Sequence, residues 1–242
     1  MGEVRGLAQR VLLILGFVQL IHGSGCATAV PAPAPGTSTL AGRLEVRPPM
    51  PGAGAGQSAY GDRRLRDASR VDYSRPGFAV VHLELAEPAA GRSDPVAITR
   101  ITLRDGPVRV GIDPDELALA TGSRLAIRNE SRDRHVVSIP GLGRVMPVEP
   151  GSEVDFEVDR SGDLALYLLD RPGVSARLFS SGGPFARVAD SGRFVLADLP
   201  PGMHRVHVWH SRLPPISDLV ELKPDRIEWV DLVLGSPDPH GD

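Results

Sequence analysis

The stretch Val188–His210, VADSGRFVLADLPPGMHRVHVWH, decides the fold class. It opens on the run DSG at 190–192, where an Asx side chain can bond its own backbone and glycine accepts a positive φ. A strand pattern follows and stops at PPG, 200–202, because proline cannot donate to a β-ladder. Residues 204–209 then alternate at the strand period of two. The pattern predicts the start of a β-hairpin, a tight corner and a second strand, all structural in role.

The composition of the whole chain also favours β-structure with many turns. Its 242 residues include 23 prolines and 27 glycines, and no long run of helical period follows the N-terminal segment. This length suffices for one or two domains that each bury a core. The formal net charge is −3, so no strongly charged surface indicates nucleic acid or an anionic bilayer as a partner.

Residues 1–25 are typical of a signal peptide. Their apolar run at 11–21 is too short to span a bilayer, and it ends in the small residues of 23–25. Cys26, the only cysteine, follows and resembles the lipidated cysteine of a bacterial lipobox, although Gly23 replaces the usual aliphatic residue. A lone thiol has no disulfide partner in an oxidising compartment. We expect an exported, periplasmic lipoprotein anchored to the outer membrane through Cys26; the alternative is ordinary signal cleavage beside an incidental cysteine.

The mature chain begins with a tether and two strands that are far from the deciding stretch. Residues 26–37 are rich in proline and alanine, which predicts a semi-extended tether. Strands are predicted at 40–46 and 78–85, and the second has apolar residues on both faces, as in the interior of a sheet. The next strand of this series arrives only after Val188.

The motif D-x-G-R-F-x-L-x-x-L-P-P-G with its V-W-H ending resembles the end of the carboxypeptidase-regulatory-like module, a transthyretin-like β-sandwich. The chain as a whole resembles bacterial periplasmic proteins often labelled methylamine utilization proteins, which join that module to a cupredoxin-like domain. Because the module's strands are split, we expect a cupredoxin-like domain inserted between its halves; two sequential sandwiches are the alternative. The implied segments are 38–90 (first half of the regulatory-like sandwich), 91–183 (cupredoxin-like Greek-key domain), 184–236 (second half) and 237–242 (tail).

Short strand candidates fill the middle of the chain, and their spacing suits a Greek-key sandwich or barrel. Within it, ATGSRLAIRNESRDRHVVS at 120–138 resembles the cupredoxin motif that presents the first copper-binding histidine. Asn129 and His135 match the asparagine and histidine of that motif, while its aspartate is shifted or replaced by Ser131. The predicted strands are 97–104, 109–112, 116–120, 124–129, 135–139, 153–158 and 164–169.

The resemblance implies that the other copper ligands come from a downstream C-x-x-H-P-x-M loop, and this loop is degenerate. A blue-copper site needs a thiolate, two imidazoles and a weak axial thioether. Aligned on Pro172, the loop has Leu168 at the cysteine position, Arg171 at the second histidine and Val174 at the methionine. We therefore expect no type 1 copper, no other cofactor and no metal site.

His135 is then a remnant ligand position with two interpretations. One makes it part of a weak, non-blue metal site with Asp133 or another acceptor. The other makes it a partly buried histidine that is hydrogen-bonded to a neighbouring loop. We favour the second, because one imidazole without convergent partners makes no stable metal site.

Other histidines form the run H-x-x-H-x-x-H at His204, His207 and His210. On a strand the first and last point to one face and the middle one to the other, with about 20 Å between the ends of the run. They therefore predict core and surface histidines rather than a metal site. His82 lies mid-strand among valines and is expected to be a satisfied interior or edge residue.

The remaining candidates are weak. The carboxylates of DPDE, 113–116, lack the alternating spacing of a calcium loop and predict an ordinary turn. Trp209 and Trp229 are expected to pack in the core. No serine lies in a G-x-S-x-G elbow, and no phosphate-binding glycine loop is present.

These observations predict an all-β protein of two sandwich domains that is not an enzyme. We expect an envelope binding or accessory module that contacts an unidentified protein or polysaccharide through loops on a rigid frame. The alternative is a periplasmic metal-binding or electron-transfer protein. A hydrolase would need a nucleophile and base brought together from distant strands.

Overall fold

The computed structural model describes residues 30–48, 71–84, 98–107 and 110–235. Within these ranges the chain forms β-strands, one short 3-10 helix, η1 (Pro140–Leu142), and no α-helix. No helix in the described part is therefore long and apolar enough to cross a membrane. The prediction of an all-β sandwich protein is confirmed. The export signal and Cys26 lie outside the described residues, as does the tail at 237–242.

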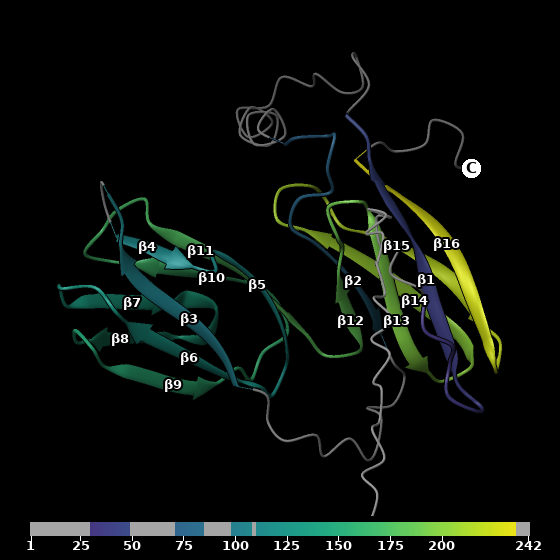
Figure 1. Cartoon of the computed structure of the whole chain (residues 1–242), viewed down its shortest axis with the longest axis horizontal. Helices are drawn as coiled ribbons and strands as arrows, with labels where there is room; N and C mark the ends of the chain where they lie inside the picture. Colours follow the sequence, from purple (N-terminus) through teal and green to yellow (C-terminus); the bar gives the residue numbers. More distant parts are fainter. Residues whose placement is uncertain (1–29, 49–70, 85–97, 108–109, 236–242) are drawn as a thin grey trace, which may run out of the picture.

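The first of two sandwiches, here called the split sandwich, is built from segments far apart in the chain (right side of Figure 1). One sheet has the order β13-β1-β16, and the other has the order β12-β2-β14-β15. β1 lies in the middle of its sheet, antiparallel to β13 and parallel to β16. The strands are β1 (Ser38–Val46), β2 (Ala79–Glu84), β12 (Phe185–Arg187), β13 (Arg193–Leu199), β14 (Gly202–His210), β15 (Ile216–Leu222) and β16 (Arg226–Leu234).

The second, continuous sandwich lies at the left of Figure 1 and uses only β3 to β11. Its sheets have the orders β4-β3-β6-β9 and β5-β11-β10-β7-β8. The chain therefore leaves the split sandwich after β2 and returns to it at β12; residues 85–97, between β2 and β3, lie outside the described ranges. The strands are β3 (Ile98–Asp105), β4 (Val110–Asp113), β5 (Glu116–Ala120), β6 (Arg124–Asn129), β7 (His135–Ile139), β8 (Arg144–Val148), β9 (Glu153–Glu157), β10 (Gly162–Leu168) and β11 (Ser175–Ser181).

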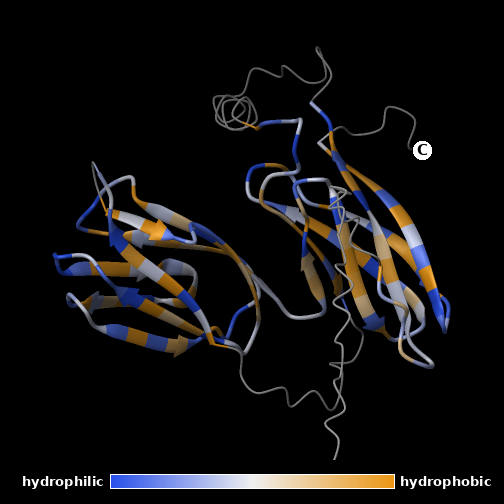
Figure 2. Ribbon diagram, viewed as in Figure 1, coloured by the Kyte–Doolittle hydropathy of each residue, from blue (hydrophilic) through white to orange (hydrophobic). Residues whose placement is uncertain are grey.

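Each sandwich encloses its own apolar core. Hydrophobic and hydrophilic residues alternate along many strands, as the bands in Figure 2 show, because successive side chains point to opposite faces of a sheet. Leu125, Ile127 and Leu166 are fully buried in the continuous sandwich, and Leu40 and Leu199 are buried in the split one. β2 lies between β12 and β14, which confirms its predicted place inside a sheet.

The deciding stretch forms two strands in two different sheets, so the predicted hairpin is wrong. β13 pairs with β1, whereas β14 pairs with β2 and β15. The corner between β13 and β14 carries the chain across the sandwich, with Asp198 at φ 55° and Gly202 at φ 129° on either side of two prolines. Proline cannot donate to a ladder, so the corner ends one sheet and starts the other.

An aromatic cluster joins the two sandwiches. Phe179 of β11 in the continuous sandwich packs against Trp209 and His82 of the split one, with ring centroids 4.8 and 5.1 Å apart. Phe78 meets Trp209 edge to face at 5.2 Å. Trp209 therefore packs between the sandwiches. Trp229 is 67% exposed on β16, so its predicted place in a core is wrong; its position in the strand points it away from the packed face.

Candidate functional site

His135 begins β7 and lies at the centre of a buried polar cluster. Its side chain is 0% exposed, which is more complete burial than the sequence predicts. Its Nδ1 lies 2.8 Å from Oδ2 of Asp170, and its Nε2 lies 2.9 Å from Oγ of Ser131. Both ring nitrogens are therefore engaged, one by the loop after β10 and one by the loop before β7.

Asp170 reaches His135 because β7 and β10 are neighbours in the sheet. Leu168, the last residue of β10, pairs with Val137 of β7. Asp170 follows two residues later, and its Oδ1 accepts a hydrogen bond of 2.8 Å from the backbone N–H of Val136. Partial burial acts to raise the pKa of Asp170, but the hydrogen bonds from Val136 and His135 outweigh it and lower the pKa. The carboxyl group is ionised at neutral pH.

Asn129, at the end of β6, holds the loop that carries Ser131. Its Nδ2 donates to the backbone carbonyls of Asp133 and Val148, at 2.8 and 2.9 Å. Its Oδ1 accepts from the N–H and the hydroxyl of Ser131, at 3.0 and 2.6 Å. The motif asparagine thus satisfies buried backbone groups, which would be costly to leave unpaired.

The three degenerate ligand positions surround the same cluster. Leu168 and Val174 are buried in the core at 2% and 9% exposure, where neither side chain can ligate a metal. The side chain of Arg171 is 42% exposed, and its guanidinium donates to Asp133 at 2.7 Å and lies 3.9 Å from Asp170. Asp133 is therefore paired with Arg171, and the carboxylate on His135 comes from Asp170 instead.

The donors at this place do not fit a copper centre. A type 1 site needs a thiolate and two imidazoles, and the cluster offers one imidazole, one carboxylate and one hydroxyl. Across the described ranges, no group of three or more His, Cys, Asp or Glu side chains converges to hold a metal. A metal at His135 would also have to displace Asp170 or Ser131 from a ring nitrogen.

Ser131, His135 and Asp170 contact one another in the series serine, histidine, carboxylate, as in a hydrolytic triad. The sequence did not reveal this arrangement. Triad chemistry needs a nucleophile that a substrate can reach. Ser131 is only 5% exposed, and its hydroxyl lies closer to Asn129 Oδ1, at 2.6 Å, than to the imidazole. The three side chains therefore form a buried hydrogen-bonded cluster. The S-x-x-x-H spacing was visible in the sequence, but Asp170 becomes a partner only through the pairing of β7 with β10.

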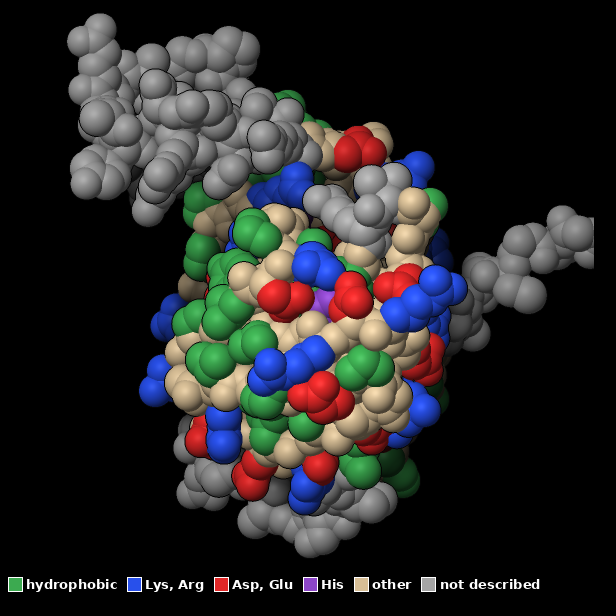
Figure 3. Space-filling model, turned by 90° about the vertical axis from the view of Figure 1, so that its left-hand side faces the viewer, with side chains coloured by type: hydrophobic (Ala, Val, Ile, Leu, Met, Phe, Trp, Pro, Cys, Tyr) green, Lys and Arg blue, Asp and Glu red, His purple; other side chains and the backbone are tan. Residues whose placement is uncertain are grey.

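The surface over this end of the continuous sandwich has no single sign of charge. Figure 3 shows acidic and basic side chains interspersed there, with hydrophobic side chains on one flank. Arg104 contacts both Asp113 and Glu130, and Arg134 contacts Glu149, all as exposed ion pairs. Exposed pairs of this kind contribute little to stability. The segment 113–116, which carries the carboxylates of DPDE, connects β4 to β5.

The other histidines do not converge. On β14, His210 is buried and His207 lies on the opposite face, as the strand period predicts. His207 stacks on His82 with ring centroids 5.0 Å apart and lies 3.4 Å from Glu84. Burial, with a smaller contribution from the neighbouring His207, lowers the pKa of His82 to about 4. His82 is thus a neutral packing residue at neutral pH.

Comparison with known proteins finds similarity only among solved structures. No family model and no curated protein matches the chain. A purple cupredoxin from Nitrosopumilus maritimus is 17% identical, with 34% of this chain and 99% of that one covered and a TM-score of 0.30. A reduced proline-to-phenylalanine mutant of amicyanin is 12% identical, with 41% and 99% covered and a TM-score of 0.30. Pseudoazurin from Methylobacterium extorquens AM1 is 14% identical, with 35% and 76% covered and a TM-score of 0.30.

Proposed function

We propose that this protein is a non-catalytic envelope module with a binding or accessory role, whose continuous sandwich is a cupredoxin-like domain without type 1 copper. The observation that carries the proposal is the pairing of His135 with Asp170. This carboxylate comes from the loop in which a cupredoxin would hold its remaining ligands. The place of the metal is taken by a hydrogen-bonded carboxylate.

The cupredoxin-like assignment is supported by sequence and position together. Asn129 and His135 match the motif, and the degenerate loop from Leu168 to Val174 joins β10 to β11 next to that histidine. The histidine segment and the ligand loop, which a copper site requires to lie together, therefore are neighbours although they are separated in sequence. The regulatory-like assignment of the split sandwich rests on the motif around Pro200 alone.

We further propose that the chain is exported and held at the outer membrane by lipid on Cys26, so that both sandwiches face the periplasm. The support is the signal-like segment of 1–25 followed by a lone cysteine. The partner would be an envelope protein or a polysaccharide. Mass spectrometry of the membrane fraction should find acylated Cys26 as the first residue, and a Cys26→Ser chain should be released in soluble form. A soluble native chain with a free thiol would overturn the lipid anchor.

Calorimetric titration of the full chain with copper and zinc tests the loss of metal binding. We expect no binding tighter than about micromolar, which corresponds to about −8 kcal/mol, and no difference between the native chain and His135→Ala. One-to-one binding that disappears in His135→Ala would overturn the proposal. It would favour a metal-binding or electron-transfer protein, in which a metal displaces Asp170 or Ser131 from a ring nitrogen of His135.

A further inference from the structure

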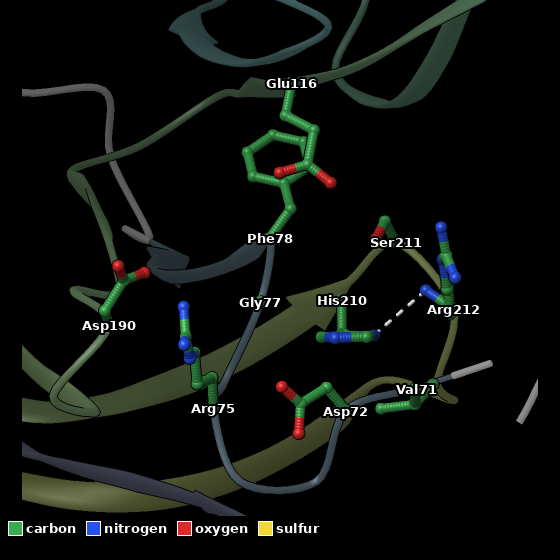
Figure 4. Close-up of a pocket in the computed structure, with 10 residues that line it drawn as sticks. All are labelled: Val71, Asp72, Arg75, Gly77, Phe78, Glu116, Asp190, His210, Ser211 and Arg212. Atoms are coloured by element: carbon green, nitrogen blue, oxygen red, sulfur yellow. Dashed lines mark hydrogen bonds between the residues drawn. The ribbon is translucent and has the colours of Figure 1, made fainter. Parts of the chain in front are cut away.

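A pocket of about 300 Å³ lies where the two sandwiches meet. Figure 4 shows that its walls come from the segment before β2, the turn before β13, the loop after β14 and the start of β5. Glu116 is the contribution of the continuous sandwich, and the other lining residues belong to the split one. Small-molecule sites typically measure about 300–1,000 Å³ and often lie at domain junctions. The pocket is therefore the size of a small metabolite.

Most polar groups of this pocket already have partners inside the protein. Asp72 accepts hydrogen bonds from the N–H and hydroxyl of Ser74, at 3.0 and 2.6 Å. Glu116 lies 3.4 Å from Arg187. Nδ1 of His210 accepts from the backbone N–H groups of residues 212 and 213. Burial lowers the pKa of His210 to about 4, so this wall is neutral at neutral pH.

Arg75 and Asp190 are different. Among the described residues, neither charged side chain makes a hydrogen bond or a close ion pair, although Arg75 is near enough to Asp72 to help lower the pKa of that carboxyl. In Figure 4, Arg75 stands between Asp190 and His210, and Asp190 approaches from the far side of the pocket. Phe78, which is 1% exposed, supplies an apolar wall beside them. Two charges of opposite sign, neither held by a hydrogen bond among the described residues, thus flank one small, partly apolar space.

We propose that this pocket binds a small zwitterion, such as a free α-amino acid, with its carboxylate on Arg75 and its ammonium group on Asp190. Guanidinium and carboxylate groups make the strong, charge-assisted hydrogen bonds of such recognition. A simple anion would meet repulsion from Asp190, and a simple cation would meet repulsion from Arg75. The inference rests on the proposed function only in treating the protein as a binding module, and its site is separate from His135.

The test is calorimetric binding of each common L-α-amino acid to the full chain. For the tightest binder we expect millimolar affinity or better, and a loss of tenfold or more in both Arg75→Gln and Asp190→Asn. The corresponding amine without the carboxylate, and the acid without the amine, should each bind at least tenfold more weakly. Arg226→Gln, which removes an exposed arginine at the start of β16, is the matched control and should leave affinity unchanged.

Thermal unfolding of each variant shows whether it is folded, and unchanged melting with lost binding supports the site. The proposal is overturned if no amino acid binds at millimolar concentration, if both pocket variants bind as well as the native chain, or if the amine alone binds equally well. None of these outcomes depends on copper or zinc. A failure here is therefore distinguishable from a failure of the proposed loss of metal binding.

Discussion

Replacing Asp170 with alanine should destabilise the continuous sandwich by about 2–4 kcal/mol. The substitution removes the acceptor of two hydrogen bonds, from His135 Nδ1 and from the N–H of Val136, each 2.8 Å long. A donor that loses its partner in a buried place costs about 1–3 kcal/mol. His135 is fully buried and the Asp170 side chain is only 27% exposed, so water cannot easily replace the lost acceptor.

Asp133→Ala is the matched control for this experiment. It also removes a carboxylate from the cluster, but Asp133 is 63% exposed and, within the part of the chain that the structure describes, its carboxylate pairs only with the guanidinium of Arg171. A surface pair of this kind contributes about 0–1 kcal/mol. Urea unfolding at neutral pH, followed by far-ultraviolet circular dichroism, should separate the two variants. Equal unfolding free energies for Asp170→Ala and Asp133→Ala would refute the reasoning.

The effect of Asp170 should also depend on pH. The pKa of Asp170 in the folded protein is below its ordinary value of about 4, because hydrogen bonds from Val136 and His135 outweigh the opposing effect of burial. The stabilisation is therefore complete above the unfolded value and is lost as the pH falls through the lower folded value. The difference between the native chain and Asp170→Ala should shrink only below about pH 4.

Three further predictions concern the rest of the fold. The pKa of His82 is lowered to about 4 by burial, so stability should fall as the pH drops from about 6.5 toward 4; His82→Gln should flatten part of that slope in urea titrations, and an unchanged slope would contradict it. Phe179→Ala should weaken the contact between the sandwiches by about 3 kcal/mol, so that calorimetry resolves two separate unfolding transitions. A thermogram identical to that of the native chain would show that the contact is unimportant. Gly42→Ala should destabilise the split sandwich by about 1–3 kcal/mol, because the added Cβ would overlap the Val230 carbonyl. Gly111→Ala, which has open space around it, should leave the melting temperature unchanged, and equal effects of the two substitutions would contradict the packing argument.

Strand positions in the continuous sandwich could be predicted closely from local pattern. The strands at 116–120, 124–129 and 135–139 have the predicted bounds, because each is a short, largely apolar run bounded by turn residues. β8 was missed because Pro147 interrupts its pattern, and β11 because polar residues surround its apolar centre. Local pattern is a weak guide where a strand gains its stability from its neighbours.

Contacts between residues far apart in the chain could not be predicted from the sequence. The motif identified His135, but its contact with Asp170 depends on the register that pairs Leu168 with Val137. The exposure of Trp229 likewise depends on which face of β16 meets the core. The junction pocket combines residues from four separate segments, which no local spacing could indicate. Cys26 and the export signal stay predictions, since they lie outside the described residues.

The most direct test of the central claim is the visible absorption spectrum during copper titration, for the full chain beside a variant carrying Leu168→Cys, Arg171→His, Val174→Met and Asp170→Ala. A thiolate bound to copper gives an intense visible band; the first three changes restore the ligand types of a blue-copper site, and the fourth frees a ring nitrogen of His135. The account predicts no band for the native chain and a band for the variant. A band in the native chain, or none in a variant that is shown to be folded, would contradict it.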